Sequence, residues 1–306
     1  ELKGAGARTI MLSLDGRLRD IPVAALWTGE RWVAELYPTT VFTPVTSDKR
    51  RTPPPPGEAS VIALGVSEGL EYLPPMPGVA TEIERLVGSG SRPGLLKGSA
   101  VMNRDFTRAE FFRAISSGAQ IVHIASRFSL DYGNFENSSL FLGDGDTINI
   151  RELKRSPEFN LKGADLVTLT VVDSSAMNGI ILDLGEFFQM HGASAVLTTL
   201  VSVNDKSAAD FITEFYRQRY IAGKNKAEAL REAQLTFLSQ ATPGDADQPH
   251  TPHPPSGGSG MSSAPGSADS NAGNVPDSAP DAPRWSGRGY SHPNFWAPYI
   301  IIGNFR

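Results

Sequence analysis

The chain has 306 residues, of which 40% are hydrophobic and 20% are charged, so it is long enough for one large domain or two small ones. It contains no cysteine, which excludes disulfides, thiolate metal sites and a cysteine nucleophile. A formal net charge of -5 argues against a nucleic-acid surface, because such a surface needs a basic stripe that neutralises phosphates.

Nothing in the sequence predicts a membrane partner. No window reaches the roughly 18 uninterrupted apolar residues that a membrane helix needs, and the N-terminus lacks the pattern of a signal peptide. We therefore expect an intracellular, cytoplasmic protein. Because the chain begins with Glu1, we also expect it to be a piece of a longer polypeptide.

The first 45 residues differ in pattern from the rest of the chain. They alternate or pair around an Asp-Gly and a Thr-Gly turn, which predicts an N-terminal hairpin region at one end of a sheet. A proline-rich stretch, residues 48–60, follows. Its composition predicts a stiff linker between two strand-rich segments.

Short apolar runs then alternate with amphipathic segments. The predicted strands are 60–66, 120–126, 164–173 and 193–203. The predicted helices are 78–89, 107–118 with Thr107 as N-cap, 181–192, and two within 207–240. This order favours an α/β fold, a three-layer α/β/α sandwich with a mostly parallel central sheet.

Two further segments complete the expected single domain, residues 1–306. Residues 139–150 read as a hairpin with Gly-Asp-Gly-Asp at its tip, which lacks the further ligands of a calcium loop. Residues 241–284 contain almost nothing to bury, which predicts a disordered insertion. The residues that follow the insertion have the composition of a terminal strand.

In an open α/β sheet, ligands and catalytic groups gather at the carboxyl ends of the strands. Two predicted core strands lead into Arg127 and Asp173, so we expect the site there. No glycine-rich phosphate fingerprint follows a strand, which disfavours a nucleotide enzyme, and we expect neither a cofactor nor a metal.

Eight segments resemble a CHAT domain, in the order in which that family carries them. They are 15–26, 76–86, 122–128, 164–175, 191–205, 215–223, 227–234 and 291–304. CHAT domains are caspase-like proteases of the separase and caspase clan. The resemblance therefore implies a caspase-like sandwich and a cysteine peptidase with a histidine base at one strand end and a cysteine nucleophile at the next.

Carried over residue by residue, the resemblance places Arg127 where the family has the catalytic histidine and Phe128 where it has a glycine. It places Val172 where the family has the nucleophile. Arginine stays protonated near neutrality and cannot act as a general base, and valine has no nucleophilic atom. No catalytic dyad is intact. The former active-site groove would comprise His123, Arg127, Phe128, Val172, Asp173, Ser174 and Asp205.

Several of these residues allow two interpretations. His123 is either a structural core histidine, which we favour, or a base that reaches the site. Asp173 and Arg127 either form an ion pair or are both solvated. Asp205 either lines a specificity pocket or caps a helix, the latter being favoured. Ser174 or Ser175 would be the nucleophile if a serine had replaced the cysteine.

These observations favour a degenerate CHAT pseudopeptidase that works as a protein-binding or scaffolding module of a larger protein. The resemblance implies an N-terminal helical repeat region of TPR type, and the groove would hold a protein or peptide by strand addition. The alternative is an active endopeptidase whose cysteine and histidine were exchanged artificially or replaced by a serine-based nucleophile. A third hypothesis is a small-ligand binding domain.

Overall fold

The computed structural model describes residues 6–48, 58–70, 73–90, 92–173, 179–203, 205–240 and 290–306, together with three isolated positions, Leu2, Gly4 and Pro55. The side chains of residues 47, 48, 171–173 and 205 are not part of this description. The predicted insertion 241–284 and most of the predicted linker 48–60 lie outside the described residues.

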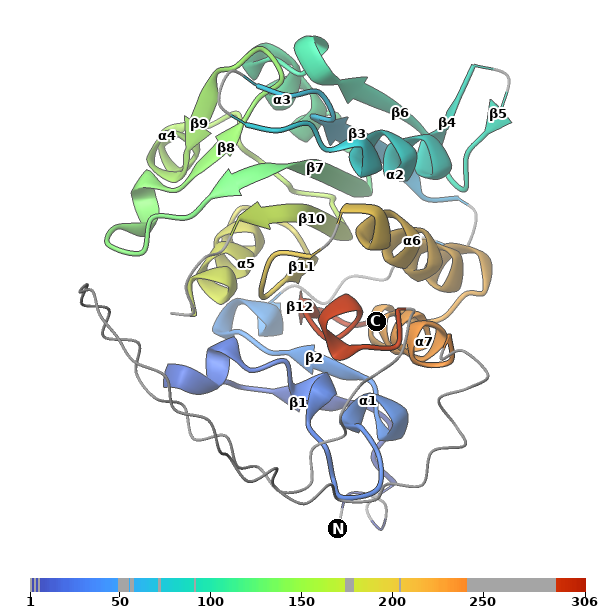
Figure 1. Cartoon of the computed structure of the whole chain (residues 1–306). Helices are drawn as coiled ribbons and strands as arrows, with labels where there is room; N and C mark the ends of the chain where they lie inside the picture. Colours follow the sequence, from blue (N-terminus) through green and yellow to red (C-terminus); the bar gives the residue numbers. More distant parts are fainter. Residues whose placement is uncertain are drawn as a thin grey trace, which may run out of the picture.

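Within the described residues, a ten-stranded sheet runs through the centre of the molecule (Figure 1). Across the sheet, the strands follow the order β1 (Ile10–Leu12), β2 (Thr39–Val41), β12 (Tyr299–Gly303), β11 (Ala195–Thr199), β10 (Leu166–Asp173), β7 (Ile121–Ser129), β3 (Ser60–Gly65) and β6 (Lys97–Met102). Two further strands, β8 (Ser139–Phe141) and β9 (Thr147–Asn149), extend from β7, and β4 (Gly88–Ser89) with β5 (Arg92–Pro93) forms a separate ribbon.

The sheet is mostly parallel. Strands β11, β10, β7, β3 and β6 all run in one direction, whereas β12 is antiparallel to β11 and carries β2 and β1 parallel to itself. The predicted core strands are confirmed. Their near-continuous apolar runs are buried on both faces, which a parallel sheet covered by two helix layers requires.

Helices cover both faces of the sheet (Figure 1). One layer contains α1 (Val33–Leu36), α2 (Pro77–Val87), α6 (Asp205–Tyr216) with the π-helical turn η6 (Arg217–Ile221), and α7 (Lys226–Leu238). The other contains α3 (Arg108–Ile115), α4 (Ile150–Arg155) and α5 (Ile180–Met190). The predicted three-layer α/β/α sandwich is therefore confirmed.

Short 3-10 turns connect these elements. They are η1 (Gly16–Asp20), η2 (Val23–Ala25), η3 (Pro44–Asp48), η4 (Asn103–Asp105), η5 (Phe135–Asn137) and η7 (Pro293–Phe295). The predicted N-cap of α3 is confirmed, because the Thr107 hydroxyl accepts from the Glu110 N–H. His191 follows the last residue of α5 as its C-cap, and its Nδ1 lies 2.8 Å from the Phe187 carbonyl oxygen.

The predicted N-terminal hairpin is wrong, because β1 and β2 pair in parallel. Asp15 does not open a hairpin turn. Its side chain accepts from the Gly16 N–H and begins η1. The Thr-Gly turn does reverse the chain, but only for a single bridge between Trp27 and Trp32. The Thr-Gly prediction of a chain reversal was therefore correct, whereas the Asp-Gly pair begins a 3-10 turn, and neither pair of residues reveals which strands pair.

The hairpin predicted within residues 139–150 is confirmed, since β8 and β9 pair antiparallel. At its tip, the carboxylate of Asp146 forms an ion pair with Arg108 at 3.0 Å, and the same guanidinium lies 2.6 Å from Glu152. These contacts give the Gly-Asp-Gly-Asp segment a structural role. They attach the hairpin to α3 and α4.

Candidate functional site

The two strands that carry the candidate site are neighbours, and a bulge shifts their register just before the site. Leu169 of β10 pairs with Ile124, whereas Val171 pairs with Arg127, so that two residues of β7 face one residue of β10. Beyond the bulge, Val172 is registered opposite Phe128. Arg127 and the Val172 backbone therefore lie one register position apart on adjacent parallel strands.

Arg127 is a half-buried residue whose guanidinium is turned toward the segment before α2. Its Nη2 donates to the carbonyl oxygen of Pro74 at 3.0 Å. The bond links the end of β7 to the chain that enters α2 at Pro77. At the position of the expected base, this chain thus holds a permanent cation that donates hydrogen bonds and accepts none.

Strand β7 continues farther than the sequence predicts. We expected it to end at Ser126 and to leave Arg127 beyond it, but β7 runs to Ser129. The extension has partners on both sides, because Phe128 pairs with Leu140 of β8 while Val172 pairs with it from β10. A buried Ser126 hydroxyl also donates to the Phe141 carbonyl at 2.7 Å. The β8–β9 hairpin therefore stabilises the extension.

Phe128, which the resemblance was expected to place at a glycine position, is 1% exposed and belongs to the large core cluster on the α3 and α5 side. Its ring fills space that a glycine would leave empty. Asp173 is the last residue of β10 and is registered opposite Ser129. Ser174 and Ser175 lie outside the described residues, and Asp205 is the first residue of α6.

His123 lies in the middle of β7 and has no access to solvent. Its Nε2 is 2.9 Å from Glu82 Oε1 on α2, and its Nδ1 is 3.2 Å from the Tyr216 hydroxyl on α6. Although these two atoms are close, neither His123 Nε2 nor Glu82 Oε1 has a hydrogen-bond partner among the described residues. Thr168 bonds the same tyrosine hydroxyl at 2.7 Å, and burial raises the pKa of Tyr216.

The surroundings of His123 are those of a structural residue. It lies four positions before Arg127, a distance of about 13 Å along an extended strand. Polar groups of three other elements, Glu82, Tyr216 and Thr168, enclose its ring. The structure does not bring His123 together with Arg127 as a reacting pair.

Sequence reasoning missed Asn103, which organises a loop at the carboxyl edge of the sheet. Asn103 follows β6 and has a φ of 51°, the left-handed region that asparagine tolerates better than most residues. Its Oδ1 accepts from the Ser67 N–H at 2.8 Å, from the Ser67 hydroxyl at 3.1 Å and from the Glu68 N–H at 3.1 Å. The only sequence signal for this loop was the asparagine itself, a residue type that tolerates the left-handed region.

Sequence reasoning also missed a strap, residues 15–25, that crosses the beginning of α5. The Asp20 carboxylate accepts from the Gly179 N–H at 2.6 Å, and Arg19 Nη2 lies 2.5 Å from Asp183 Oδ1. Gly179 has a φ of 69°, and a side chain there would approach within 3.1 Å of Arg19. The strap therefore fixes the helix that follows β10.

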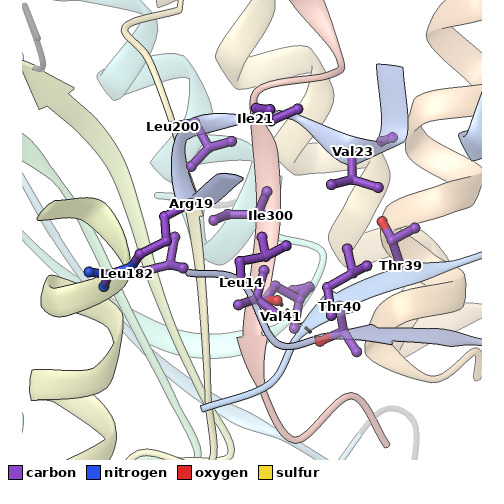
Figure 2. A pocket seen from close by; sticks show the side chains of 13 residues that line it. Leu14, Arg19, Ile21, Val23, Thr39, Thr40, Val41, Leu182, Leu200 and Ile300 are labelled. Atoms are coloured by element: carbon purple, nitrogen blue, oxygen red, sulfur yellow. Dashed lines mark hydrogen bonds between the residues drawn. The ribbon is translucent and has the colours of Figure 1, made fainter. Parts of the chain in front are cut away.

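A small apolar cavity lies beneath the strap (Figure 2). Leu14, Ile21 and Val23 come from the strap side, while Leu182 and Leu200 come from α5 and from the residue after β11. The cavity volume is about 20 Å³, which is room for one water molecule. It is far below the roughly 300 Å³ at which pockets for small molecules begin.

A cluster of buried charged residues lies at the amino end of β10, where Asp165 precedes the strand. Lys226 Nζ lies 2.7 Å from Asp165 Oδ1 and 2.5 Å from the Arg306 carbonyl oxygen. Arg219 Nη2 lies 3.7 Å from Asp165 Oδ2. All three charged side chains are at most 6% exposed, and burial lowers the pKa of Lys226 to about 8 although Asp165 opposes the shift.

Within the part of the chain that the structure describes, no three histidine, aspartate or glutamate side chains gather in an arrangement that could hold a metal ion. The same described residues contain no helix with the length and hydropathy needed to cross a membrane.

Comparison with known families matches residues 1–304 to the CHAT domain. No curated protein sequence matches the chain. Among solved structures, the Arg-specific cysteine proteinase gingipain R is similar at 9% identity and a TM-score of 0.44, over 85% of this chain and 50% of that chain. The Drosophila initiator caspase Dronc is similar at 7% identity and a TM-score of 0.37, over 63% of this chain and 77% of that chain. The chain thus spans about half the length of the gingipain chain.

Proposed function

This chain belongs to the CHAT domain family, and from that premise we propose that it is a pseudopeptidase, a CHAT domain that binds protein segments without cleaving them. The observation that carries the proposal is Arg127. It occupies the position of the expected base, one register step from Val172, and its Nη2 donates a hydrogen bond to the carbonyl oxygen of Pro74.

The chemistry of the two positions supports this reading. A cysteine peptidase needs a thiolate beside an imidazole that accepts a proton. The chain has no cysteine at any position. The arginine at the base position has hydrogen-bond donors but no acceptor, and His123 is enclosed between α2, α6 and β10.

Binding of an extended protein segment is the function that remains for the carboxyl edge. Loops at this edge are held in place by Asn103 and by Arg127, which gives a partner a fixed surface. The cavity under the strap is too small for a cofactor or metabolite, so it gives no support to the small-ligand hypothesis. The proposed partner is therefore a protein or peptide, and a helical repeat region of the same polypeptide is one candidate.

A capture experiment tests the proposal. The immobilised chain is incubated with a pool of unfolded casein fragments, and mass spectrometry compares the bound and unbound peptides. We expect captured peptides of unchanged length. Capture should fall in an Arg127→Glu variant and persist in the matched control Arg92→Glu, whose exposed arginine lies on β5. Equal capture by both variants, or shortened peptides, would refute the proposal.

The alternative, a serine-based endopeptidase, rests on Ser174 and Ser175, which follow β10 in the sequence. A fluorophosphonate probe distinguishes it from the pseudopeptidase. Labelling of the unaltered chain that disappears in a Ser174→Ala, Ser175→Ala double variant would establish the alternative. We expect no labelling.

A further inference from the structure

Strand β6 leaves one edge of the central sheet open. It pairs with β3 along its whole length, from Lys97 opposite Ser60 to Met102 opposite Gly65, and has no second partner strand among the described residues. Figure 1 shows it at the rim of the sheet. Its outward N–H and C=O groups are therefore available to another strand.

Edge strands are usually protected from pairing by prolines, bulges or charged side chains, and β6 has few of these features. The strand has six residues without a proline or a bulge, and residues 97–100 are exposed. Gly98, Ser99 and Ala100 have small side chains, and Lys97 at the beginning of the strand is its only charged residue. The opposite edge, β1, offers only three residues.

A surface hollow lies beside the C-terminal half of β6. It is lined by Ala100, Val101 and Met102 of β6, by Arg104 and Asp105 of η4, and by Thr107 and Glu110 at the start of α3. Its volume is about 560 Å³. Glu110 is paired with Arg113, whereas Asp105 forms no ion pair with any residue that the structure describes. A cation from a neighbouring strand would find an unpaired carboxylate here.

We propose that β6 pairs with β6 of a second copy of this chain, antiparallel and about a two-fold axis normal to the sheet. In such a pairing, residues that point to the same face lie opposite each other. With Ala100 at the axis, Lys97 of each copy lies opposite the point where the other copy leaves β6 at Asn103 and enters η4, the turn that carries Asp105.

The face of the sheet to which Lys97 points is consistent with this register. Val101 belongs to the core cluster on the α3 side together with Phe106 and Phe111. Lys97 lies four residues earlier and therefore points to the same face, as η4 and α3 do. Antiparallel pairing brings each Lys97 to the end of the other copy's β6, beside the turn that carries Asp105, whereas parallel pairing would place Lys97 against Lys97. Charge complementarity thus selects the antiparallel dimer.

Sedimentation equilibrium of the chain over a wide concentration range tests the proposal. A strand pair of six residues is a small contact at the low end of stable interfaces, so we expect a reversible dimer with a dissociation constant in the micromolar range. Lys97→Glu and Asp105→Lys should each weaken it about tenfold, and the double variant should restore it, because the pair is then reversed.

Backbone variants provide a second readout. Of Ser99→Pro and Ala100→Pro, one removes an outward N–H and the other an N–H bonded to β3. The variant that keeps the thermal stability of the parent should be monomeric. Met11→Lys, on the exposed edge strand β1, is the control and should not change the dimer. A chain that stays monomeric at all concentrations, or a dimer that no β6 variant affects, would overturn the proposal.

Discussion

The two ends of strand β10 carry charge in opposite ways. At the amino end, Asp165 is buried with Lys226 and Arg219, and every charge has a partner within 4 Å. At the carboxyl end, Arg127 is half-buried and makes one hydrogen bond to a backbone carbonyl. Charges that are buried and paired are difficult to replace, whereas a half-buried arginine with one hydrogen bond is easier to replace.

This difference distinguishes the scaffold of the domain from its candidate functional site. The amino end and the middle of the sheet, with His123 against Glu82, hold the fold together through buried polar contacts. At the carboxyl end, where a CHAT peptidase would have its dyad, Arg127 makes a single hydrogen bond to a backbone carbonyl. Substitutions at the two ends should therefore differ strongly in their effect on stability.

The largest effect is expected for Lys226→Ala, which leaves the buried Asp165 carboxylate without its nearest cation. Removing one partner of a buried ion pair costs about 3–5 kcal/mol. Urea unfolding followed by circular dichroism measures the change. The double variant Lys226→Met, Asp165→Asn removes both charges and should recover part of the loss. A loss below about 1 kcal/mol in the single variant would contradict a structural role of the cluster.

The second effect is a pH dependence that originates in the same cluster. Burial lowers the pKa of Lys226 to about 8, whereas the unfolded chain titrates it near 10.5. Between these values the unfolded state binds more protons, so the free energy of unfolding rises as the pH increases above about 8. The slope is at most about 1.4 kcal/mol per pH unit.

Buried tyrosines limit that rise. Burial raises the pKa of Tyr216, Tyr220 and Tyr299, so above pH 10 the unfolded chain loses tyrosine protons that the native protein keeps, and stability falls. Stability should gain about 2 kcal/mol between pH 8 and 10 and then decline. The rise should be absent in Lys226→Met. A parent curve that falls steadily from pH 8 would contradict the assigned titration.

A loss of about 2 kcal/mol is expected for His123→Leu, because Glu82 and the Tyr216 hydroxyl lose a buried partner. Thermal unfolding measures this change. Adding Glu82→Leu should restore part of the stability, since both buried polar groups are then removed. If the double variant were as unstable as the sum of the two single ones, the two residues would not be coupled.

The smallest effect is expected for Arg127→Ala. Its guanidinium contributes one hydrogen bond at a partly exposed position, so the free energy of unfolding should change by no more than about 0.5 kcal/mol. The same unfolding assay applies. A loss comparable with that of Lys226→Ala would remove the distinction between the two ends of β10.

What the sequence predicts correctly and what it misses have separate physical causes. Buried strands and amphipathic helices follow from local patterns, whereas the assignment of Arg127 and Val172 to the dyad positions stays a prediction from the family resemblance. The extension of β7 to Ser129 depends on pairing with β8, and the parallel pairing of β1 depends on a crossing strap. Asp165 and Lys226 stand 61 positions apart, and no local pattern relates them.

The most direct test of the central claim is a cleavage assay that compares the unaltered chain with an Arg127→His, Val172→Cys double variant on unfolded casein. The pseudopeptidase reading predicts that the unaltered chain leaves casein intact while remaining as stably folded as the variant. Any activity gained by the double variant would identify the two replaced positions as the missing dyad. Cleavage of casein by the unaltered chain would contradict the claim.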